Sequence, residues 1–120
     1  MKHTEQQIIE VAVKVMEDID WSYDDQEIRA IFESKEATIE KDRKYIQDQE
    51  LLEFAIKNAK PDHWIVFFEF DAQSEIENNS MHLFIWDDTA EPFEIKHKQA
   101  GFKIFKRENG SYYTEPDWKW

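Results

Sequence analysis

The stretch HWIVFFEF, residues 63–70, is the most hydrophobic segment of a chain that carries a net charge of −12. Its large apolar side chains occupy odd and even positions alike, whereas a strand with one face in water alternates apolar and polar residues. We therefore expect a strand that is covered on both faces. Each face of this strand then needs other residues packed against it.

The chain after Pro61 has the two-residue period of β-strands. Four strands are predicted from HWIVFFEFD, MHLFIWD, PFEIKHK and GFKIFKR, and a fifth is left open around SYYTE. The connections between these segments are short, which favours an antiparallel meander.

The residues before Pro61 have a helical period instead. One helix is predicted from a Thr4 cap to about residue 19, and another over residues 39–59. Residues 22–44 fit either a short helix or a hairpin around SKEA, and we favour the helix. The pattern predicts one α+β domain over residues 1–120, with N-terminal helices packed on one face of a C-terminal four- to five-stranded antiparallel meander sheet.

Short connections also allow a prediction of the strand register. Pairing across the turns puts Phe84 near Ile95, and His82 near Glu69 and His97. The face that the helices cover would then hold Ile65, Phe67, Phe84, Trp86, Phe93, Ile95, Phe102 and Ile104. A second apolar face would hold Trp64, Val66, Phe68, Phe70, Met81, Leu83 and Ile85. We expect the tail YYTEPDWKW to cover this second face, or else a twin subunit or a partner.

The amino-acid composition favours one cellular compartment and one class of binding partner. Cysteine is absent, which favours a reducing, cytoplasmic location. Neither an apolar signal segment nor a run of about 20 apolar residues occurs, so we expect no membrane association. The net charge of −12 repels nucleic acid and suits a basic protein partner. The basic segment KHKQAGFKIFKR is expected to lie beside an acidic strand.

Few segments resemble a catalytic or metal site. The predicted register brings together Glu69, His82 and His97, a set that could bind a metal or transfer protons. The acids of DIDWSYDD start like a calcium loop but lack its glycine and its closing glutamate. No phosphate-binding glycine loop, cysteine nucleophile or G-x-S-x-G motif occurs, so we expect no cofactor and no enzymatic activity.

The acidic segments supply the leading functional hypothesis. Residues 17–27 contain six acids and residues 61–95 contain nine, and neither segment contains Lys or Arg. We expect a small acidic inhibitor that occupies the cationic site of a basic toxin or nuclease, in the manner of an immunity protein or a nucleic-acid mimic. The predicted partner-binding residues are Asp18, Asp20, Asp24, Asp25, Asp87, Asp88 and Glu91, with Trp21 as an aromatic anchor.

Two alternatives remain open beside this hypothesis. One is a structural subunit or homodimeric adaptor that uses the second apolar face of the sheet. The other is a metal-dependent enzyme at Glu69, His82 and His97.

Overall fold

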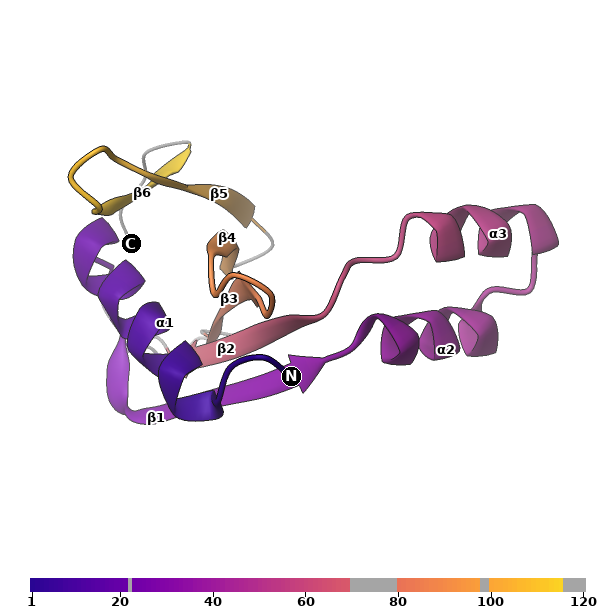
Figure 1. Cartoon of the computed structure of the whole chain (residues 1–120), viewed down its shortest axis with the longest axis horizontal. Coiled ribbons are helices and arrows are strands. Elements are labelled where there is room, and N and C mark those ends of the chain that lie inside the picture. Colours follow the sequence, from indigo (N-terminus) through magenta and orange to yellow (C-terminus); the bar gives the residue numbers. More distant parts are fainter. Residues whose placement is uncertain (22, 70–79, 98–99, 116–120) are drawn as a thin grey trace.

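The structure is a computed structural model that describes residues 1–21, 23–69, 80–97 and 100–115; for residues 24–27, 69 and 80 it describes the backbone alone. Six antiparallel strands form one sheet in the order β1-β2-β3-β4-β5-β6 (Figure 1). The strands are β1 Asp24–Glu33, β2 His63–Glu69, β3 Ser80–Trp86, β4 Pro92–His97, β5 Ala100–Lys106 and β6 Tyr112–Glu115. The helices are α1 Glu5–Ile19, α2 Lys35–Tyr45 and α3 Gln49–Lys57. The α+β meander is confirmed, with more strands than predicted.

The first helix forms as its sequence predicts. Thr4 and Gln7 make a capping box, in which the Thr4 hydroxyl accepts from the Gln7 N–H at 3.2 Å and the Gln7 amide oxygen accepts from the Thr4 N–H at 2.9 Å. The helix ends at Asp20, whose φ of 59° is left-handed. One side of α1 is buried on the sheet, through Ile8, Ala12, Val15, Met16 and Ile19.

The helix favoured over residues 22–44 is wrong in its first part. Residues 24–33 form β1, which pairs with β2 and sets Ile28 opposite Phe68 and Ala30 opposite Val66. Only residues 35–45 are helical, beginning after Ser34, whose hydroxyl accepts from the Ala37 N–H at 3.0 Å. The hairpin alternative was therefore right for β1 and wrong for the segment after SKEA.

The predicted register is wrong between β3 and β4 by one residue. The prediction placed Phe84 opposite Ile95, but Leu83 takes that position. An irregularity between Phe84 and Ile85 and a left-handed Ala90, with φ of 58°, alter the connection between the two strands. A shift of one residue moves a strand's side chains to the opposite face, so Ile95 joins the second apolar face.

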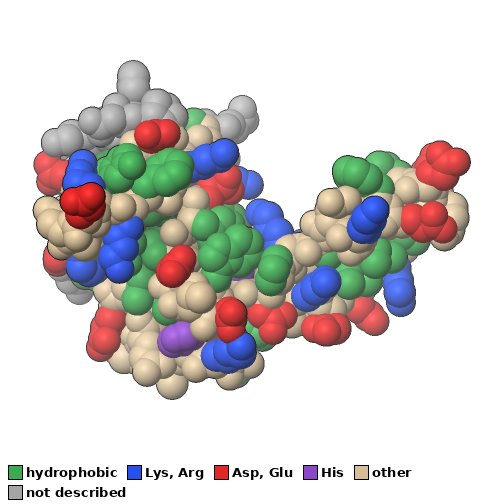
Figure 2. Space-filling view, turned by 45° about the horizontal axis from the view of Figure 1, so that its top comes forward, with side chains coloured by type: hydrophobic (Ala, Val, Ile, Leu, Met, Phe, Trp, Pro, Cys, Tyr) green, Lys and Arg blue, Asp and Glu red, His purple; other side chains and the backbone are tan. Residues whose placement is uncertain are grey.

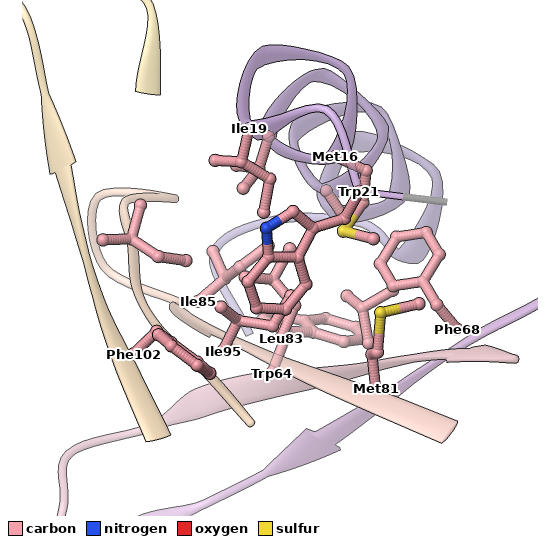
Figure 3. Close-up of a cluster of buried hydrophobic side chains, with 14 of the residues drawn as sticks. Met16, Ile19, Trp21, Trp64, Phe68, Met81, Leu83, Ile85, Ile95 and Phe102 are labelled. Atoms are coloured by element: carbon pink, nitrogen blue, oxygen red, sulfur yellow. The ribbon is translucent and has the colours of Figure 1, made fainter. Parts of the chain in front are cut away.

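That second face is the protein's core, and α1 covers it (Figure 3). Trp64, Val66 and Phe68 pack there with the apolar side of α1, and Ile95, Phe102 and Ile104 extend the face across the later strands. The N-terminal helix thus takes the place that the prediction gave to the tail. Of the tail, Tyr112 packs against this core, whereas Phe70, Trp118 and Trp120 lie outside the described residues.

The two other helices do not pack on the sheet as predicted. They form a helical hairpin, inserted between β1 and β2, that extends away from the sheet (Figure 1). We call residues 35–60 the arm. Neither α2 nor α3 contains a buried residue. None of the three described helices combines the length and apolar character needed to span a bilayer.

Candidate functional site

Asp87 lies in the turn after β3, beside the start of α1, and its side chain is only 3% exposed. Its carboxylate accepts hydrogen bonds from Trp64 Nε1 at 2.9 Å, from the Lys2 N–H at 2.7 Å and from the His3 N–H at 3.3 Å. These bonds fasten the N-terminal segment to the sheet. Asp87 is therefore committed inside the fold and does not offer its charge to a partner, contrary to the predicted role.

The surroundings of Asp87 act on its pKa in opposite directions. Burial alone would raise the pKa, because it disfavours the charged form. The hydrogen bonds from Trp64, Lys2 and His3 stabilise the carboxylate and bring the pKa below its usual value. The group is thus ionised and fully engaged at neutral pH.

Asp88 and Glu91, by contrast, are on the surface. The Asp88 carboxylate is 72% exposed and forms an ion pair with the Lys2 ammonium. The hydrogen bond and the charge of Asp88 raise the pKa of Lys2. At this end of α1 the predicted residues therefore divide into one buried anchor and two exposed acids, one of which is already paired.

Asp18 and Asp20 lie at the other end of α1. The Asp18 carboxylate pairs with Lys14 Nζ at 2.7 Å and accepts from the Tyr112 N–H at 3.0 Å. Burial opposes ionisation, but these hydrogen bonds lower the pKa of Asp18 below its usual value. Asp18 thereby holds β6 against the helix, while Asp20 occupies the exposed, left-handed end of α1.

Trp21 is not an exposed anchor. It is 3% exposed, and its ring meets Phe102 edge-on with centroids 5.2 Å apart. Figure 3 shows it in the middle of the buried cluster, beneath α1. Asp24 and Asp25 lie in β1, and the structure describes only their backbone.

The structure does not bring the two predicted acidic groups together. They lie at opposite ends of α1, a helix of 15 residues and hence about 22 Å long. Between them, Glu10 and Glu17 lie on the side of α1 that faces away from the sheet, and Glu5 is exposed at the first position of the helix. We call Glu5, Glu10, Glu17, Asp20 and Asp88 the acidic stripe. Glu10 and Glu17 were not predicted as binding residues, although the period that locates the apolar side of α1 also locates its opposite side.

The predicted metal set does not form in the described residues. His97 is buried on the core face, near the Trp21 ring. His82 pairs with Phe67 on the opposite face, with ring centroids 4.7 Å apart. Glu69 pairs with Ser80 rather than with His82. Two histidines on opposite faces of one sheet cannot bind the same ion, and no group of three potential ligands occurs in the described part of the chain.

A pocket of about 310 Å³ that is open to solvent lies where the arm leaves the sheet. His63 borders it and is 3% exposed; its Nδ1 lies 2.9 Å from the Pro61 carbonyl, and its Nε2 lies 3.4 Å from Glu33. Glu33 and His63 are cross-strand partners at the ends of β1 and β2. Their contact closes the base of the arm, which is a structural role.

No protein-family model, curated protein or solved structure matches this chain.

Proposed function

We propose that this protein is a small acidic inhibitor that binds a basic protein, such as a toxin or nuclease, and occupies its cationic site. The observation that carries the proposal is the distribution of charge. The arm holds six of the 27 acids and six of the 15 bases, so the rest of the chain holds 21 acids and nine bases. The whole net charge of −12 thus belongs to the part of the protein outside the arm, which we call the body.

The acidic stripe places part of this charge on a convex surface, which is the shape that fits into a cleft. A helix that lies on the surface of a sheet is a convex ridge, and Glu10 and Glu17 lie along the outward side of this ridge. Asp88 lies near its first end and Asp20 at its last. Lys14 is the single base on α1, and Asp18 already engages it. Glu5, Glu10 and Glu17 are exposed on this helix, and the field of their carboxylates would speed the approach of a cationic surface.

The spacing of the stripe favours a broad electrostatic match over a copy of a nucleic-acid strand. The carboxylates of Glu5, Glu10, Glu17 and Asp20 have a mean spacing of about 7.5 Å along the helix axis, at a rise of 1.5 Å per residue. A DNA strand has about one phosphate per 3.4 Å. We accordingly propose occlusion of a basic cleft by an acidic ridge, without phosphate-by-phosphate mimicry.

Charge reversal on the ridge tests this function. Glu10→Lys with Glu17→Lys should weaken inhibition of a basic partner by at least tenfold, because two attractive contacts become repulsive. The measurement is titration of a panel of purified basic nucleases and toxins, including products of adjacent genes, with wild type and variant. The matched control is Glu36→Lys with Glu40→Lys, which makes the same change of charge on the exposed side of α2.

The control variant should inhibit as wild type does. Equal inhibition by the ridge variant and wild type, or no binding to any basic protein of the panel, would contradict the proposal. Circular dichroism of both variants shows whether each keeps its helices.

A further inference from the structure

The arm exposes three large apolar side chains. Leu51 is 55% exposed and Phe54 is 65% exposed, both on α3, and Tyr45 at the end of α2 is 69% exposed. Figure 2 shows the arm standing apart from the body, with hydrophobic side chains at its surface and charges of both signs between them. Single exposed apolar residues are common, but two large ones on a nine-residue helix are a high density.

The arm has little to stabilise it alone. α2 has 11 residues and α3 has nine, whereas isolated helices shorter than about 12–15 residues are marginal in water. Helices in proteins gain most of their stability from burying an apolar face, and neither helix buries a residue. An occupant on the outer side of α3 would supply the missing burial.

The charges of α3 indicate what that occupant is. Glu50, Leu51, Phe54 and Lys57 share one side of the helix at helical spacing, and the third charged residue of α3, Glu53, lies at the edge of that side. The acid stands near the start of α3 and the base at its end. This pattern is complementary to itself when two copies of α3 lie antiparallel, because Glu50 of each copy then faces Lys57 of the other. A parallel pair would instead set like charges opposite each other.

We infer that the partner of the arm is a second copy of this chain, joined by an antiparallel α3–α3 contact. The two-fold axis passes between Glu53 and Phe54, the midpoint of Glu50 and Lys57. The two Phe54 rings meet near the axis with the Leu51 side chains beside them, and the Glu50–Lys57 pairs close both ends. This is an isologous interface, the commonest kind in homodimers.

Charge on the rest of the molecule agrees with this arrangement. The arm is neutral, whereas two bodies of −12 repel each other. Antiparallel arms place the two bodies at opposite ends of the dimer, farther apart than the screening length of about 8 Å in physiological salt. The inference does not depend on the proposed inhibitor function, since the acidic stripe lies on the body.

Exchange of the paired charges tests the interface in the full chain. Wild type at about 100 µM should sediment at twice the 14.6 kDa mass of one chain. Glu50→Lys alone and Lys57→Glu alone should each weaken dimerisation about tenfold or more, because each sets like charges together at both ends of the interface. Mixing the two variants should restore a dimer of one chain of each, since both pairs are then of opposite sign.

The mixture uses the same folded proteins as the separate samples, so a loss of folding cannot mimic its result. Phe54→Ser should also give monomers, while Phe105→Ser, a matched change of an exposed phenylalanine on β5, should leave the dimer intact. A monomeric wild type, a dimer that Glu50→Lys leaves unchanged, or a mixture that stays monomeric would each overturn the inference.

Discussion

At the scale of single residues, the acids of this chain divide into structural and surface groups. Asp87 and Asp18 hold the two ends of α1 through hydrogen bonds from Trp64, Lys2 and Tyr112. Glu10 and Glu17 on the same helix face solvent. Sequence does not separate these groups, because a buried carboxylate is recognisable only from the donors that the fold assembles around it.

Replacement of Asp87 tests its structural role. Asp87→Asn should lower the free energy of unfolding at pH 7 by about 1–3 kcal/mol, because it removes a charged acceptor from three buried or half-buried donors. Chemical denaturation measures this change. The matched control is Asp88→Asn on the exposed neighbour, which should have little effect.

The difference in stability between wild type and Asp87→Asn should also depend on pH. The pKa of Asp87 is lower in the folded protein than its usual value, so its contribution to stability is complete above the unfolded pKa of about 3.9. That contribution is lost as the pH falls through the folded pKa. The stability difference between wild type and Asp87→Asn should therefore be constant from pH 7 to about 5 and should shrink in more acidic solution; a constant difference down to pH 2 would contradict the assignment.

Replacement of Trp21 distinguishes a core residue from a binding anchor. Trp21→Ala should lower the free energy of unfolding by about 3–5 kcal/mol, because it leaves a large cavity between α1 and Phe102. Phe105→Ala, at an exposed position, should lower it by less than about 1 kcal/mol. Thermal denaturation of both variants provides the comparison, and a Trp21 variant as stable as wild type would remove Trp21 from the core.

At the scale of elements, the sequence predicts periodic segments well and their pairing less well. The capped, amphipathic α1 and the strands after Pro61 appear where their periods place them. β1 was missed because Ile28, Ala30 and Phe32 fit a strand while Ile28, Ile31 and Phe32 fit a helix, and only pairing with β2 decides. Local pattern cannot contain that tertiary information.

The prediction assigned the helices to the wrong face of the sheet for a similar reason. Both faces of β2 and β3 are apolar, so hydrophobicity does not fix the register with β4. The turn around Ala90 fixes it instead. The candidate metal site at Glu69, His82 and His97 depended on that register, and it fails once His97 moves to the core face.

The arm is predicted to be dispensable for folding of the body. Replacing residues 35–60 with a short turn should leave β1 and β2 paired and shift the melting temperature by only a few degrees, since the arm supplies no buried residue. Thermal denaturation and the near-ultraviolet circular dichroism of the buried Trp21 and Trp64 measure the result. An unfolded product would show that the arm stabilises the sheet.

At the scale of the whole molecule, the protein combines a strongly acidic body with an arm of no net charge that exposes large apolar side chains. We propose a basic protein as the partner of the body and a second copy of the chain as the partner of the arm. A dimer joined through its arms would present two acidic stripes, so a partner that is itself dimeric would gain in apparent affinity from both.

The salt dependence of binding tests the central claim most directly. For the tightest basic partner in the panel, we predict that the logarithm of the association constant falls steeply and linearly with the logarithm of salt concentration between about 50 and 500 mM, through a lower association rate. The Glu10→Lys, Glu17→Lys variant should have a shallower slope. An association constant unchanged across this range would contradict an inhibitor that acts through its acidic surface.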